Sequence, residues 1–209
     1  MSTYLCIRQK SHPARAEGRI SMQRLIGSLT VLLFVGLVIT RILLMRRAGL
    51  KAVYFANIDK KDFLIPPFAF LYIYIVIAPP LRLPAVSKQE FFRSQALSWV
   101  GVFLCLLGLL LFLVSLFSFG RSFRVGIDTD TPGKLITTGV FALSRNPIYV
   151  ACWTIMFGQF LIFPNWILLV YLPGAAWLFH RQVLREEEFM GRHYGEEYVE
   201  YCNRVRRYL

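Results

Sequence analysis

Polar and ionisable residues stand at both ends of one long apolar stretch in the last third of the chain. The run SRNPIY at 144–149 precedes the stretch, and the run RQVLREEEF at 181–189 follows it. Charged groups are costly in hydrocarbon, so a sequence that brings arginine, asparagine and glutamate to the mouth of an apolar hairpin has a use for them there. Arginines can clamp an anion with bidentate geometry, and carboxylates accept hydrogen bonds from hydroxyls. The pattern therefore predicts a binding site at a membrane surface.

The composition indicates the class of protein that must position these residues. The chain has 209 residues, of which 56% are hydrophobic and 17% charged, and its mean hydropathy is +0.51. These values are typical of a multispanning membrane protein. The net charge of +12 comes from basic residues that lie between apolar segments. This placement favours contact with anionic membrane lipids over binding to nucleic acid.

Five apolar segments predict an all-α protein with five transmembrane helices. The first three are residues 25–45, 63–78 and 96–119. The stretch 148–179 is too long for one ordinary span, and Pro164 with Asn165 divides it into a short helical hairpin. The charged, helix-permissive segment from His180 onward should form a separate helix at the membrane surface.

The distribution of basic residues orients these spans. With five spans, fifteen of the lysines and arginines fall on the side of residue 209 and eight on the other side. The positive-inside rule then places the C-terminal segment and the binding site in the cytoplasm. We expect three regions: a polar tail at 1–21, which is disordered or an over-extended start, two spans at 22–95, and a functional core at 96–209.

Cysteine and histidine usage predicts neither a disulfide framework nor a metal site. The four cysteines are scattered, with two in apolar segments and two near the ends, and the three histidines are equally dispersed. Paired spacing is the usual mark of a ligand cluster or a disulfide scaffold. The sequence therefore predicts free thiols at Cys6, Cys105, Cys152 and Cys202.

Two motifs around the hairpin resemble those of a known family. TPGKLITTGVFALSRNPIYVA at 131–151 is followed by the hairpin, then by an acidic pair and by YGEEYVEYCNRVRR at 194–207. This order resembles the isoprenylcysteine carboxyl methyltransferase family of integral membrane methyltransferases, within the wider group that includes phospholipid methyltransferases. The resemblance covers residues 119–207. Two motifs that flank a hairpin of fixed length are more specific than either motif alone.

The resemblance implies an S-adenosylmethionine pocket on the cytoplasmic side and a lipophilic substrate that enters from the bilayer. No metal is implied. The residues expected around the cofactor are Gly133, Lys134, Leu135, Ile136, Phe141, Asn146, Pro147, Ile148, Tyr149, Glu186 and Glu187. The residues expected to clamp an anionic substrate and so to serve catalysis are Arg145, Arg181 and Arg185.

Three positions depart from the family's common pattern. Asn146 stands where the family most often has histidine, and asparagine cannot act as a base near neutrality. Phe141 replaces a tyrosine of the eukaryotic enzymes. Gln182 occupies the place of an arginine that the family uses for the substrate carboxylate. These changes concern the methyl acceptor more than the methyl donor.

Other interpretations of the same residues remain open. Asn146 and Pro147 also fit an ordinary helix start, and the acidic run at 186–188 fits a solvated helix face. The arginines could anchor the protein to lipid phosphates. Two further classes of protein share the general layout: a sterol-type membrane reductase that uses a nicotinamide cofactor, and a non-catalytic scaffold with the same fold.

Overall fold

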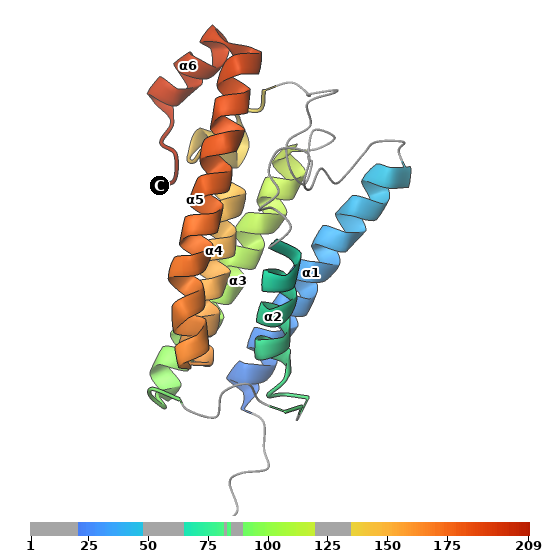
Figure 1. The fold of residues 1–209 in the computed structure, drawn as a ribbon, viewed down its shortest axis with the longest axis vertical. Coiled ribbons are helices and arrows are strands. Elements are labelled where there is room, and N and C mark those ends of the chain that lie inside the picture. Colours follow the sequence, from blue (N-terminus) through green and yellow to red (C-terminus); the bar gives the residue numbers. More distant parts are fainter. Residues whose placement is uncertain (1–20, 48–64, 82, 85–89, 120–134) are drawn as a thin grey trace, which may run out of the picture.

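The computed structural model describes residues 21–47, 65–81, 83–84, 90–119 and 135–209. Within these ranges the regular structure is entirely helical. The helices are α1 (Met22–Arg47), α2 (Ile65–Ile77), α3 (Gln95–Phe119), the short 3₁₀ helix η3 (Gly139–Ala142), α4 (Pro147–Ile162), α5 (Trp166–Tyr194) and α6 (Glu196–Arg204). Figure 1 shows α1, α3, α4 and α5 as long, roughly parallel rods, with the shorter α2 beside α1. The predicted tail at 1–21 lies almost wholly outside the described residues.

Helices α3 and α4 pack so closely that their backbones touch. A Cβ atom added at Gly158 would lie 2.6 Å from the carbonyl oxygen of Gly101, and one added at Gly108 would lie 2.9 Å from that of Ala151. Small residues allow this approach, which is a common way for helices to associate in lipid. The interface fixes the start of α4 relative to the end of α3, and the site is built around that start.

Buried polar side chains attach α1 to its neighbours. Gln159 is fully buried, and its amide donates a 2.7 Å hydrogen bond to the carbonyl of Gly27. The hydroxyl of Ser28 donates a 2.8 Å bond to the carbonyl of Val76 at the end of α2. In lipid no hydrophobic driving force brings helices together, so hydrogen bonds between helices contribute to their association. The N-terminal helices are thereby held against the α3–α4 pair.

The hairpin is present, but its second arm is longer than the sequence predicts. Helix α4 ends at Ile162 and α5 begins at Trp166, so the predicted break at Pro164 and Asn165 is confirmed. The side chain of Asn165 caps α5 by accepting a 2.9 Å bond from Leu168 N. However, α5 continues without interruption from the apolar span to Tyr194. The segment from His180 onward is helical, as predicted, but its first part continues α5, because no residue there stops the helix before Gly195.

Three helices in the described part are long and apolar enough to cross a membrane: α1, α3 and α5. Helices α2 and α4 are apolar but shorter. At 1.5 Å per residue they extend roughly 20 Å and 24 Å, less than the roughly 30 Å of a hydrocarbon core. The all-helical membrane fold is thus confirmed. The expected number of five complete spans is not.

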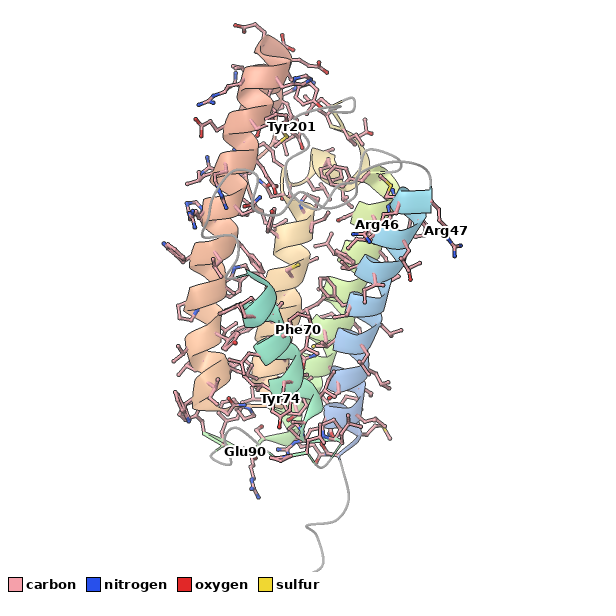
Figure 2. All side chains as sticks on the ribbon, turned by 45° about the vertical axis from the view of Figure 1, so that its right-hand side comes forward. Arg46, Arg47, Phe70, Tyr74, Glu90 and Tyr201 are labelled. Carbon is pink, nitrogen blue, oxygen red and sulfur yellow. The ribbon has the colours of Figure 1, made fainter. Side chains whose placement is uncertain are left out.

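The two ends of the bundle differ in charge and in contacts. Figure 2 places Arg46 and Arg47 toward the end where Tyr201 lies, and Glu90 at the opposite end. At that opposite end Glu90 forms ion pairs with Arg24 and Arg93, which join α1 to the segment before α3. The predicted functional residues that the structure describes belong to α4, α5 and the segment before α4, and Tyr201 bonds that segment at Phe141.

Candidate functional site

The site forms where the first turn of α4 faces the last third of α5. The hydroxyl of Tyr149 donates a 2.7 Å hydrogen bond to Glu186 Oε1, and the amide of Gln182 donates a second bond of 2.9 Å to the same oxygen. Both donors bond Oε1, and Glu186 Oε2 has no donor among the described residues. The two sequence motifs therefore meet at one carboxylate oxygen, Glu186 Oε1.

The antiparallel arrangement of α4 and α5 explains how Tyr149 and Glu186 meet. Measured along the helices from the hairpin turn, Tyr149 stands about 20 Å from the end of α4 and Glu186 about 30 Å from the start of α5. Side chains lean toward the N-terminus of their own helix. Tyr149 therefore reaches away from the turn and Glu186 reaches back toward it. The two side chains can therefore meet although their backbone positions lie at different distances from the turn.

Glu187, the next residue, points to a different set of partners. Its Oε1 atom accepts a 3.2 Å hydrogen bond from the amide of Asn146 and lies 3.2 Å from a guanidinium nitrogen of Arg145. Its Oε2 atom accepts a 2.8 Å bond from Arg207 Nε. The side chains of Arg145 and Glu187 are only 10% and 9% exposed. Burial of a carboxylate is costly unless the group is paired and hydrogen-bonded, and these three partners meet that requirement.

Residues 205–209, called the strap below, run beside the loop that leads into α4. The carbonyl of Arg206 accepts a 3.0 Å bond from Arg145 N, and the carbonyl of Arg207 accepts a 3.1 Å bond from the Asn146 amide. The hydroxyl of Ser144 lies 3.4 Å from the same Arg207 carbonyl. Tyr208 OH is 2.8 Å from His180 Nδ1 on α5. The strap thus joins the loop to α5.

Helix α6 supports the loop from the other side. The hydroxyl of Tyr201 donates a 2.6 Å bond to the carbonyl of Phe141 in η3. Burial raises the pKa of Tyr201 to about 12, so the hydroxyl remains protonated and donating at physiological pH. The chain reaches this position by turning sharply at Gly195, whose φ of 53° favours glycine. Gly139 begins η3 and also has a positive φ, of 65°.

The remaining predicted cofactor residues lie around the loop but show fewer polar contacts. Leu135 and Ile136 are half-buried in an extended segment before η3. Phe141 is buried, and its ring packs edge-on against Phe119 with centroids 4.6 Å apart. Pro147 is the first residue of α4, as the helix-start interpretation predicts, and Ile148 packs into the α3–α4 core. Gly133 and Lys134 lie outside the described residues.

The three predicted substrate arginines have separate surroundings. Arg145 is paired with Glu187. Arg185 donates a 2.6 Å bond to Gln182 Oε1, which in turn orients the Gln182 amide toward Glu186. Arg181 lies over the ring of Trp177 at 5.7 Å, a contact typical of the membrane interface. Arg185 thereby contacts the group formed by Tyr149, Gln182 and Glu186.

Two interpretations of single residues can now be decided. Asn146 is the N-cap residue of α4, but its side chain makes no capping bond and donates to Glu187 and Arg207 instead. The acidic run is not one solvated face, because only Glu188 is exposed, paired with Arg192. Sequence reasoning missed Arg207 as a partner of Glu187. No local pattern could reveal it, because the contact depends on the turn at Gly195.

A bundle of apolar helices with one cluster of glutamates, arginines and tyrosines at its end defines a helical membrane protein with a polar site at one surface. Comparison with known proteins agrees with this class. Residues 96–197, from α3 to the start of α6, match the family model for phospholipid methyltransferase. The match includes Tyr149, Glu186 and Glu187 and excludes the strap.

Curated relatives make the assignment more specific. The chain is 30% identical over 112 residues to protein-S-isoprenylcysteine O-methyltransferase of Xenopus laevis and 32% identical to that of Rattus norvegicus, each match covering 52% of this chain and 39% of the relative. It is 29% identical over 127 residues to protein-S-isoprenylcysteine O-methyltransferase B of Arabidopsis thaliana, covering 57% and 64%. The chain therefore covers less than two thirds of the length of these relatives. Over the matched region the chain is similar to protein-S-isoprenylcysteine O-methyltransferases, in agreement with the family that the motifs predict.

Proposed function

We propose that this protein is a membrane methyltransferase that takes its methyl group from S-adenosylmethionine and acts on a lipophilic substrate from the bilayer. The match of residues 96–197 to the phospholipid methyltransferase family model and the similarity to protein-S-isoprenylcysteine O-methyltransferases support the reaction class. The observation that carries the site is the convergence of Tyr149, Gln182 and Glu186, which are contributed by both arms of the hairpin. We place the functional core at residues 96–209, with the site in the cytoplasm.

The residues of this cluster fit the proposed cofactor. S-adenosylmethionine carries a ribose diol, an adenine ring, an amino-acid tail and a sulfonium cation. Glu186 Oε2 can accept hydrogen bonds from the ribose hydroxyls, because the two donors recorded for this carboxylate both bond Oε1. The ring of Tyr149 lies 5.6 Å from that of Phe179, which gives an aromatic surface beside the carboxylate. The negative charge of Glu186 also favours a cationic ligand.

The role of the protein in such a reaction is positional. A sulfonium supplies an activated methyl group that a nucleophile displaces in line, so that the protein has to align the two reactants and exclude water. Tyr149 and Gln182 fix the Glu186 carboxylate, and Arg185 fixes Gln182. The close contact between α3 and α4 fixes the position of α4, and so of Tyr149, along α3. No described residue needs to form a covalent intermediate.

Arg185 is the cation best placed to hold an anionic acceptor. Arg145 is buried against Glu187 and Arg181 lies over Trp177, whereas Arg185 contacts Gln182 inside the cluster. A carboxylate acceptor is already ionised at neutral pH and requires only such a clamp. We therefore propose Arg185 as the first choice of the three arginines for contact with the acceptor. Arg145 is better explained as a partner of Glu187.

Calorimetric titration of the detergent-solubilised protein with S-adenosylmethionine tests the donor site. Glu186 and Glu188, two residues apart, offer a matched pair, because Glu188 is exposed on the same helix and is paired with Arg192. We expect Glu186→Gln to weaken binding about tenfold or more, from the loss of a charge-assisted hydrogen bond to the ligand. Glu188→Gln should bind as the wild type does.

Equal binding by all three proteins would remove Glu186 from the site. Absence of binding to folded wild-type protein would refute the proposed function and favour the scaffold interpretation. Transfer of a radiolabelled methyl group from the donor to components of a lipid extract then identifies the acceptor. Glu186→Gln should reduce that transfer in proportion to its loss of donor affinity at low donor concentration.

A further inference from the structure

Glu187 joins its own helix to two segments that lie elsewhere in the sequence. It lies on α5, accepts a hydrogen bond from Asn146 at the start of α4, and is paired with Arg207 in the strap. Asn146 uses its single amide nitrogen twice, for the Glu187 carboxylate at 3.2 Å and for the Arg207 carbonyl at 3.1 Å. Arg207 therefore holds Asn146 through its backbone and holds Glu187 through its side chain.

The residues of this network are neighbours in the chain of those at the proposed donor site. Tyr149 N donates a 3.1 Å bond to the carbonyl of Asn146, so the two residues share the first turn of α4. On α5 the neighbouring residues Glu186 and Glu187 point about 100° apart, one toward Tyr149 and the other toward Asn146. A displacement of Asn146 would consequently move Tyr149 relative to Glu186.

We propose that Arg207 and Glu187 are positioning residues, and that the strap at 205–209 holds the first turn of α4 in the geometry that the donor site requires. The inference rests on the proposed function and deepens it, because it adds to the site a segment outside the matched family region. The strap acts without touching the cofactor. Its side-chain contacts are the Arg207–Glu187 pair and the Tyr208–His180 contact, and its backbone contacts are made by the carbonyls of Arg206 and Arg207.

The network supports positioning better than general stabilisation because of where its bonds lie. The Arg145 and Asn146 donors that bond the strap are residues of the loop between η3 and α4. The α3–α4 interface, which holds the bundle together, is formed by other residues. Loss of the Arg207 side chain should therefore loosen the loop and leave the helices packed.

Arg207→Met provides the test, and Arg206→Met provides its control. Both substitutions remove one positive charge from the strap, but the exposed Arg206 contributes only its carbonyl to the network. Hydrogen–deuterium exchange of the ligand-free full chain reports on the peptide at 139–149. We expect about tenfold faster exchange at Arg145 in Arg207→Met, because its backbone N–H is bonded to the Arg206 carbonyl of the strap. Exchange within α3 should be unchanged.

Function is measured on the same proteins. Donor affinity, corrected for the folded fraction, should fall about tenfold in Arg207→Met and remain within about twofold of wild type in Arg206→Met, since only the former disturbs a bond to a charged group. The Michaelis constant for the donor should rise more than kcat falls. Arg207→Lys keeps a charged donor and should recover part of the affinity. A purely structural role would lower the folded fraction without changing the affinity of folded molecules.

The outcomes separate this proposal from the proposed function. If wild-type protein binds the donor but Arg207→Met shows wild-type exchange and affinity, the strap has no positioning role. If wild-type protein binds no donor, the methyltransferase assignment fails, and exchange alone decides whether the strap holds the loop. Faster exchange in both Arg207→Met and Arg206→Met would mean that general charge loss, not the Glu187 contact, controls the loop, which also overturns the proposal.

Discussion

Three consecutive glutamates on α5 have three different environments. Glu186 faces Tyr149, Glu187 is buried against Arg145 and Arg207, and Glu188 is exposed beside Arg192. The rotation of about 100° per residue in an α-helix separates them. From sequence alone such a run is typical of a solvated face. The presence of three glutamates in a row therefore does not predict their roles. The role of each carboxylate depends on the residues that it contacts.

The Tyr201 hydroxyl offers a test at a single residue. Tyr201→Phe removes the bond to Phe141 and should lower the free energy of unfolding by about 1 kcal/mol at pH 7. Burial raises the pKa of Tyr201 to about 12, so the protonated form is favoured in the folded state. The stabilisation is complete below the unfolded pKa near 10 and is lost as the pH rises toward 12. Thermal unfolding of both proteins at pH 7 and pH 11 should show the difference shrinking; a wider gap at pH 11 would contradict this account.

Some site residues were predictable and others were not. Tyr149 and Glu186 could be paired in advance because family motifs mark both. Arg207 could not, because its partner lies across a turn that is set by the positive φ of Gly195. Arg145 was predicted to face the substrate, and this remains untested, but its burial against Glu187 favours a structural role. Composition cannot distinguish an arginine that binds a ligand from one that neutralises a neighbour.

At the scale of elements, apolar length and helix breakers predicted most of the boundaries. The third predicted span at 96–119 matches α3, and the break at Pro164 and Asn165 separates α4 from α5. The length of α5 was mispredicted because hydropathy falls at His180 while helical propensity does not. Pro173 does not interrupt α5 either. In lipid the backbone has no alternative partner for its hydrogen bonds, which favours continuation of the helix.

The α3–α4 contact makes a prediction at this scale. Gly158→Ala places a methyl group 2.6 Å from the carbonyl oxygen of Gly101, so the helices must separate. We expect a loss of about 1–3 kcal/mol, the usual cost of overpacking. Gly36→Ala is the control, because a Cβ there meets nothing within 4 Å and alanine is the better helix former. Thermal unfolding in detergent should show a lower midpoint for Gly158→Ala alone, and comparable midpoints would indicate that the contact is not tight.

At the scale of the whole molecule, the basic end of the bundle predicts its orientation. Arg46 and Arg47 lie toward the end that carries Tyr201 (Figure 2), and the strap and Tyr201 both bond the segment before α4. We expect the site and residue 209 in the cytoplasm and the start of α1 on the other side. In a bacterial host, green fluorescent protein fused after residue 209 should fluoresce, and alkaline phosphatase fused there should be inactive. The reverse pattern would place the site outside the cytoplasm and leave it without access to cytoplasmic S-adenosylmethionine.

The length of α5 has a kinetic consequence. The helix carries Glu186 about 30 Å from the hairpin turn, a distance equal to the thickness of the hydrocarbon core. In the proposed reaction S-adenosylmethionine would thus come from the aqueous phase, whereas the lipophilic acceptor would come from the two-dimensional membrane. For an acceptor dissolved in that film, the governing concentration is its mole fraction among the lipids. Added vesicle lipid would then slow turnover by surface dilution, even when the bulk concentrations of enzyme and acceptor stay constant.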